Sequence, residues 1–310
     1  ALFRRIYNTI LVQKNNIHIL LQTYFGDIRD IYTEVTKMPF DGIGLDFIEG
    51  KETDLLIEKY GFPQDKLLFA GLVNGKNIWK NHYEKTLRIL TKLQEQGIRT
   101  VLSTSCSLLH VPYTVKHEKV LSAKYLSYFA FAEEKLNELA ELKNLAESKD
   151  YSLETAYGEN AKLFVGERDC FNEDVHKRLS HVTESDYVRV PRRSERQKLQ
   201  KKEFALPELA TTTIGSFPQT KDVKANRSAY RKGEISEKEY KEFNKRKIAE
   251  CVKLQEEIGL DVLVHGEYER NDMVEYFGES LGGFVFTEKA WVQSYGTRCV
   301  KPPIIWGDVY

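Results

Sequence analysis

The chain has 310 residues, of which 41% are hydrophobic, so it can bury the core of one large domain or of two ordinary ones. Its 46 basic and 46 acidic side chains cancel, which argues against a general affinity for nucleic acid or for a membrane surface. No uninterrupted apolar run approaches the roughly 20 residues that span a bilayer. The four cysteines, at positions 106, 170, 251 and 299, form no CxxC pair. We therefore expect a soluble, cytoplasmic protein with reduced thiols.

The first twelve residues, ALFRRIYNTILV, carry arginines within an apolar stretch and have no small-residue cleavage site. They do not resemble a secretory signal. They also open in the middle of an amphipathic pattern without an initiator Met, so we expect a further part of the protein upstream.

Up to about residue 150, short apolar runs alternate with longer stretches of helical spacing. The strand-like runs, with the near-continuous hydrophobicity of strands buried on both faces, are residues 17–22, 42–47, 67–72 and 99–103. Helical spacing marks residues 28–37, 51–60 and 81–96, and the composition of residues 118–148 is typical of one long helix. The pattern predicts an α/β fold with a parallel sheet or barrel. Because no GxGxxG follows any strand, it favours half of a (β/α)8 barrel over a Rossmann half.

The composition changes between residues 189 and 202, where seven Lys or Arg gather. We interpret this segment as a solvated connector rather than a nucleic-acid patch, because no aromatic residue is interleaved to stack bases. A second β/α region follows, with a strand at about residues 209–214 and another at 261–265. Between them, Ser236 and Glu239 form a capping box that predicts a helix ending near residue 258.

The segment TTTIGSFPQT, residues 211–220, ends the first of these strands with Ile214, Gly215 and Ser216. Glycine lets the backbone approach a ligand closely, and exposed amides together with the Ser216 hydroxyl can hold a carboxylate. An ordinary strand-to-loop turn explains the same residues.

The next predicted strand closes with His265, Gly266 and Glu267, and Glu269 and Arg270 follow. A carboxylate at the C-terminal end of a strand can pair with a ligand ammonium or act as a base. A structural cluster of ion pairs is the alternative interpretation.

The segment WVQSYGTRCVKPP, residues 291–303, is too polar for a core strand. Arg298 and Lys301 could hold an acidic tail, and Trp291 could cover a flat ring. The alternative is a surface loop with a buried cysteine at position 299.

Cys106 and His110 stand at i and i+4, a spacing that can bind metal when the segment is helical. Two ligands do not make a site, however, because structural zinc uses four protein ligands and catalytic zinc three. We therefore expect no metal site in this chain.

These segments resemble cobalamin-independent methionine synthase, which methylates homocysteine from a methyltetrahydrofolate polyglutamate. The resemblance implies parts of two (β/α)8 TIM-type barrels: the later part of the N-terminal barrel at 1–150, a helical, basic connector at 151–205, and the first part of the catalytic barrel at 206–310. It implies that homocysteine is bound by Ile214, Gly215, Ser216 and Glu267, and the folate substrate, 5-methyltetrahydropteroylpolyglutamate, by Arg298 and Cys299. Cys106 is then a relic of a zinc-ligand position.

The resemblance further implies a zinc-dependent methyltransferase that uses no cobalamin and is a monomer at full length. The family's zinc ligands lie downstream of this chain, so we expect the chain alone to contain no catalytic residue and no metal site and to be inactive. Other interpretations stay open: another TIM-barrel methyltransferase or decarboxylase, a non-catalytic ligand-binding relative, or a scaffold whose basic arm binds RNA.

Overall fold

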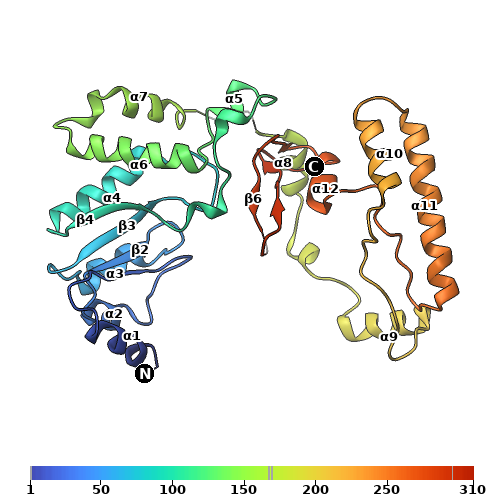
Figure 1. The fold of residues 1–310 in the computed structure, drawn as a ribbon, viewed down its shortest axis with the longest axis horizontal. Coiled ribbons are helices and arrows are strands. Elements are labelled where there is room, and N and C mark those ends of the chain that lie inside the picture. Colours follow the sequence, from blue (N-terminus) through green and yellow to red (C-terminus); the bar gives the residue numbers. More distant parts are fainter. Residues whose placement is uncertain (1, 167, 169, 295) are drawn as a thin grey trace. The chain divides into compact units, whose positions relative to one another are not determined.

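The computed structural model describes residues 2–166, 168, 170–294 and 296–310, and they form two compact units (Figure 1). The first unit comprises Ala1–Cys170 together with Val285–Ile304. The second comprises Phe171–Phe284 together with Ile305–Tyr310.

The first unit is built on a four-stranded parallel sheet in the order β1-β2-β3-β4. The strands are β1 (Leu20–Gln22), β2 (Gly42–Asp46), β3 (Leu67–Val73) and β4 (Thr100–Thr104). All five residues of β2 are buried, as its continuous apolar run requires. The parallel α/β prediction for this region is therefore confirmed, although β1 begins at residue 20 and not at residue 17.

Helices connect and cover these strands. The three predicted connecting helices are present as α2 (Tyr32–Lys37), α3 (Thr53–Tyr60) and α4 (Tyr83–Glu95), and α1 (Leu2–Val12) precedes them. Helix α6 (Ala132–Glu147) contacts α4, β3 and β4, and α7 (Thr155–Lys162) contacts α4 (Figure 1). The apolar core includes the fully buried Ile43, Leu68 and Leu93.

The prediction of one helix over residues 118–148 is wrong in its first half. Only α6 is a long helix there; η1 (Leu108–His110), η2 (Val115–His117) and the short α5 (Ala123–Leu126) come before it, and η3 (Tyr151–Leu153) follows it. Phe129 and Phe131 are buried, and the Ala130 amide donates to the Ile78 carbonyl at 2.7 Å. Tertiary packing of these aromatic residues therefore overrides the helical propensity of the segment.

The second unit is mainly helical. It contains α8 (Glu173–Leu179), η4 (Glu184–Tyr187), α9 (Arg193–Phe204), α10 (Lys221–Arg231), α11 (Glu237–Ile258) and α12 (Met273–Glu279). Helices α10 and α11 pack side by side (Figure 1). The predicted capping box is confirmed, because Ser236 Oγ accepts from the Glu239 amide at 3.3 Å while the Glu239 carboxylate accepts from the Ser236 amide at 2.8 Å. The helix ends at Ile258, as predicted, and is capped by Gly259, whose φ of 84° is left-handed.

The predicted strands at 209–214 and 261–265 are wrong: neither segment is a regular strand in the described chain. They touch through the Val262 amide, which donates to the Thr211 carbonyl at 3.0 Å, and just after them Ser216 and Gly266 form an isolated parallel bridge. Ile214 is 77% exposed. A parallel strand is stable when both of its faces are covered, and here the apolar side chain that predicted the strand is not covered.

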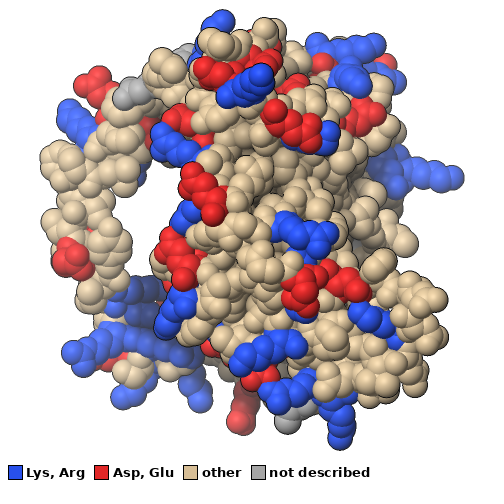
Figure 2. Space-filling view, turned by 90° about the vertical axis from the view of Figure 1, so that its left-hand side faces the viewer, with Lys and Arg blue, Asp and Glu red and all other residues tan. Residues whose placement is uncertain are grey.

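The basic segment at 189–202 contributes most of α9, and none of the residues of this helix is buried. The segment is therefore helical and solvated, and its role as a connector stays a prediction. Acidic and basic side chains are interspersed over much of the face seen in Figure 2, in keeping with the balanced charge of the chain (Figure 2). Among the described residues, no helix is long and apolar enough to cross a membrane.

Candidate functional site

Two loops of the second unit bring together the four residues predicted to bind homocysteine. Ser216 pairs with Gly266 in a parallel bridge, and the Phe217 amide donates to the Gly266 carbonyl at 3.0 Å. The loop that holds Ile214, Gly215 and Ser216 therefore lies beside the loop that holds Glu267.

Gly215 leaves room for the Glu267 carboxylate. A Cβ atom at position 215 would lie 2.7 Å from Glu267 Oε1, so a larger residue would force this carboxylate to move. The glycine thus allows the carboxylate to lie directly over the backbone of the neighbouring loop, next to Ser216.

The backbone of Glu267 is unusual because its φ of 56° lies in the left-handed region. A non-glycine residue there costs on the order of 1–3 kcal/mol and persists only where its surroundings hold it. Gly266 before it is also left-handed, at 86°, and a Cβ atom there would lie 2.6 Å from the Tyr268 ring. The tight turn at 266–267 directs the Glu267 side chain toward Gly215.

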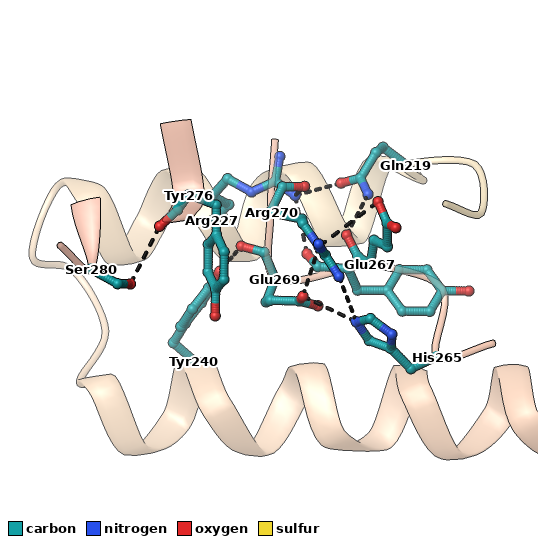
Figure 3. A network of polar contacts seen from close by, with 10 residues as sticks. Gln219, Arg227, Tyr240, His265, Glu267, Glu269, Arg270, Tyr276 and Ser280 are labelled. Carbon is teal, nitrogen blue, oxygen red and sulfur yellow. Dashed lines mark hydrogen bonds and ion pairs between the residues drawn. The ribbon is translucent and has the colours of Figure 1, made fainter. Parts of the chain in front are cut away.

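An ion-pair cluster lies next to Glu267, as the alternative interpretation of this segment predicts (Figure 3). Glu269 Oε1 lies 3.1 Å from His265 Nε2 and 3.0 Å from Arg270 Nε. Burial raises the pKa of the Glu269 carboxyl, but the hydrogen bond from His265 and the nearby charge of Arg270 outweigh burial and lower the pKa overall. Glu267 is at the edge of this cluster, with Oε2 3.8 Å from Arg270 Nε. Its contact with Arg270 is the longer of the two, so Glu267 is better placed than Glu269 to receive a ligand cation.

A cavity of about 300 Å³ adjoins this network. Two buried polar atoms in residues that line it, Arg227 Nε and Glu269 Oε2, have no hydrogen-bond partner in the described structure, and Arg270 Nε has only its ion-pair contacts with Glu267 and Glu269. The remaining lining residues come from α10, α11, the loop before α12, and α12: Tyr230, Arg231, Tyr240, Asn271, Asp272, Glu275, Tyr276 and Glu279.

Sequence reasoning missed two residues that join the loops, Gln219 and Arg227. Gln219 Nε2 donates to the Glu267 carbonyl at 3.2 Å, and Arg227 donates to Gln219 Oε1. Gln219 belongs to the 211–220 motif and could have been identified from it. Arg227 lies among many charged residues on an ordinary helix, and no local pattern distinguishes it.

The two predicted folate residues belong to the first unit. Strands β6 (Val292–Gln293) and β7 (Cys299–Val300) form an antiparallel hairpin, and the Ser294 amide donates to the Arg298 carbonyl at 2.8 Å. The alternative of a buried cysteine is wrong, because Cys299 is exposed. Tyr295 of the same motif lies outside the described residues.

This hairpin is anchored within the first unit. The carboxylate of Glu118, which is 5% exposed, accepts the amides of Glu288 at 2.6 Å and Lys289 at 2.7 Å. Strand β6 also contacts η1. A single buried side chain thus fixes the segment that leads into Arg298 and Cys299.

The geometry of Cys106 and His110 does not support a metal site. Cys106 is buried and precedes η1, so the pair is not on one face of an α-helix, and the His110 ring lies edge-on to Phe25 with centroids 5.4 Å apart. Among the described residues, no group of three or more His, Cys, Asp or Glu side chains could hold a metal ion. The part of the chain that the structure describes therefore does not fit a zinc ion.

Comparison with known proteins links both ends of the chain to one family. Residues 1–97 match the N-terminal domain of cobalamin-independent synthase, and residues 209–310 match its catalytic domain. A Lactococcus lactis subsp. cremoris protein named 5-methyltetrahydropteroyltriglutamate--homocysteine methyltransferase is 56% identical over 308 residues, which are 99% of this chain and 40% of that protein. A Campylobacter jejuni protein of the same name is 54% identical over 309 residues, 100% of this chain and 41% of its own length. The chain thus spans about two fifths of the length of these relatives.

Proposed function

This chain belongs to the cobalamin-independent synthase family, and we propose that the protein transfers a methyl group from a 5-methyltetrahydropteroyl polyglutamate to homocysteine, forming methionine without cobalamin. The names of relatives that are more than half identical to this chain support this reaction.

The observation that carries the proposal is the adjacency of Ser216 and Glu267. Homocysteine is an amino acid, so it presents a carboxylate and an ammonium a few ångströms apart. The Glu267 carboxylate suits the ammonium, and the Ser216 hydroxyl with the backbone amides of its loop suits the carboxylate. A carboxylate beside a set of hydrogen-bond donors can therefore bind the ammonium and the carboxylate of one amino acid together.

The hairpin residues Arg298 and Cys299 are proposed to contact the folate substrate. Arg298 is exposed on the hairpin, and a guanidinium is suited to the carboxylates of a glutamate tail. Trp291, which is also exposed at the start of this segment, offers a flat apolar surface for a ring.

Several further properties are proposed on family grounds. They are parts of two (β/α)8 barrels with boundaries near residues 150 and 205, a zinc ion held by ligands outside this chain, a cytoplasmic location and a monomeric full-length protein. Zinc, when bound, would keep the homocysteine sulfur as a thiolate at neutral pH. We assign no step through zinc to the residues described here, and we propose that the chain alone transfers no methyl group.

Replacing Glu267 with Gln in the intact protein tests the assignment. We predict that homocysteine binds about 10- to 100-fold more weakly, because the charge-assisted contact to the ammonium is lost, while affinity for the folate substrate stays the same. Titration calorimetry with each substrate measures both effects. Glu256→Gln, at an exposed position of α11, is the matched control. Unchanged homocysteine affinity in Glu267→Gln would sink the assignment.

A further inference from the structure

We propose that Arg227 is a positioning residue for homocysteine: through Gln219 it fixes the Glu267 loop against the Ser216 loop. The inference rests on the proposed function, since it assumes that these two loops receive homocysteine. It adds a residue from α10 that need not touch the substrate.

One guanidinium nitrogen joins three acceptors from both loops (Figure 3). Arg227 Nη2 donates to Gln219 Oε1, to the Tyr268 carbonyl at 3.0 Å and to the Arg270 carbonyl at 3.0 Å. The first acceptor belongs to the loop that follows Ser216, and the other two belong to the loop of Glu267. Arg227 therefore ties both loops to the same point on α10.

Gln219 completes the connection, because its amide has a distinct acceptor end and donor end. Its Oε1 accepts from Arg227, and its Nε2 donates to the Glu267 carbonyl at 3.2 Å. The Arg227 contact thereby sets the orientation of the Gln219 amide that places its N–H on Glu267. A residue that lacks either end breaks the connection.

The loop needs this support because side chains, and not a strand ladder, satisfy its backbone. Four consecutive carbonyls, at positions 267 to 270, accept from Gln219, Arg227, Tyr240 and again Arg227. The Tyr240 hydroxyl supplies the contact to position 269 at 2.9 Å. Within this loop, Glu267 holds its left-handed φ of 56°. Removing Arg227 frees two of the four carbonyls and loosens the Gln219 contact to a third.

The consequence is specific to one substrate. A loosened loop misplaces the Glu267 carboxylate relative to Ser216, so the two ends of homocysteine are no longer met together. The predicted folate residues lie on the other compact unit and have no part in this network.

The test uses Arg227→Lys, Gln219→Met and the double variant in the intact protein. Lysine keeps the positive charge but not the planar fork, and Met keeps the length of Gln219 without its polar ends. We expect each single variant to raise the KM for homocysteine by about 5- to 50-fold and the double variant to be little worse than either, because both changes break the same connection. The KM for the folate substrate should stay within about twofold. Arg246→Lys, at an exposed position of α11 outside the cavity and outside this network, is the matched control and should change neither constant.

Independent effects of Arg227→Lys and Gln219→Met that multiply in the double variant would overturn the inference, as would an equal rise in both KM values. If Arg227→Lys does not fold, Gln219→Met alone decides, because the inference requires it to raise the homocysteine KM selectively. Glu267→Gln distinguishes failure of the positioning role of Arg227 from failure of the proposed homocysteine site. Weak binding in Glu267→Gln with normal binding in the Arg227 and Gln219 variants defeats only this inference, whereas absence of homocysteine binding in the unaltered protein defeats the proposed function as well.

Discussion

At the scale of single residues, those that lie in a recognisable motif can be identified from the sequence, whereas those that support them through hydrogen bonds cannot. Gly215, Ser216 and Glu267 could be selected from the sequence because each stands in a short, unusual motif. Arg227 could not, since its importance comes from three acceptors that only the folded chain places around it. Candidate ligand contacts are therefore more predictable than the residues that hold them.

Burial changes the acid–base chemistry of Lys135. Its side chain is fully buried in the first unit, and Nζ donates to the Trp79 carbonyl at 3.1 Å. Burial lowers the pKa of Lys135 from 10.5 to about 8, and the nearby Glu138 opposes the shift only partly. Because the unfolded chain then binds more protons between these pH values, this lysine makes stability rise as pH increases from about 8 to 10.5.

Replacing Lys135 with Met should remove this pH dependence. At pH 7.5 the unaltered protein bears the cost of burying a charged lysine, and at pH 10.5 it does not, whereas Lys135→Met bears this cost at neither pH. We therefore predict that the free energy of unfolding of the variant, minus that of the unaltered protein, falls by about 2–3 kcal/mol from pH 7.5 to pH 10.5. Urea unfolding at both pH values measures the change. Lys143→Met, at an exposed position of the same helix, should show none. Parallel pH profiles for the Lys135 variant and the unaltered protein would contradict the assigned shift.

At the scale of elements, periodicity located the four parallel strands and their connecting helices, because buried strands and amphipathic helices leave distinct patterns. It failed at residues 118–131, where buried aromatic contacts override local propensity, and at 209–214, where an apolar run is exposed. Both failures depend on neighbours that are distant in the sequence. Local patterns cannot report such neighbours.

The Glu118 anchor makes an element-scale prediction. In Glu118→Gln, one amide N–H must face the new NH2 group, which costs about 1–3 kcal/mol. We expect the backbone amides of Glu288 and Lys289 to exchange with deuterium about 5- to 100-fold faster, as followed by mass spectrometry of the peptide that contains them. Glu147→Gln, which alters the ion pair with Lys143 on α6, should leave this peptide unchanged. Equal exchange in both variants would show that Glu118 does not anchor the segment.

At the scale of the whole molecule, the chain joins parts of two family domains. The described sheet and helices are those of an α/β protein, and both ends match the same synthase family. The sequence resemblance predicted this membership because its motifs are specific. The barrel boundaries and the joint placement of the homocysteine and folate residues stay predictions.

Methionine formation by the intact protein tests the proposed activity most directly. The assay supplies homocysteine, 5-methyltetrahydropteroyltriglutamate and zinc but no cobalamin. We predict turnover, and in Glu267→Gln a loss of about 10- to 100-fold in kcat/KM for homocysteine. A protein that forms no methionine under these conditions, or forms it only when cobalamin is added, would contradict the proposed function.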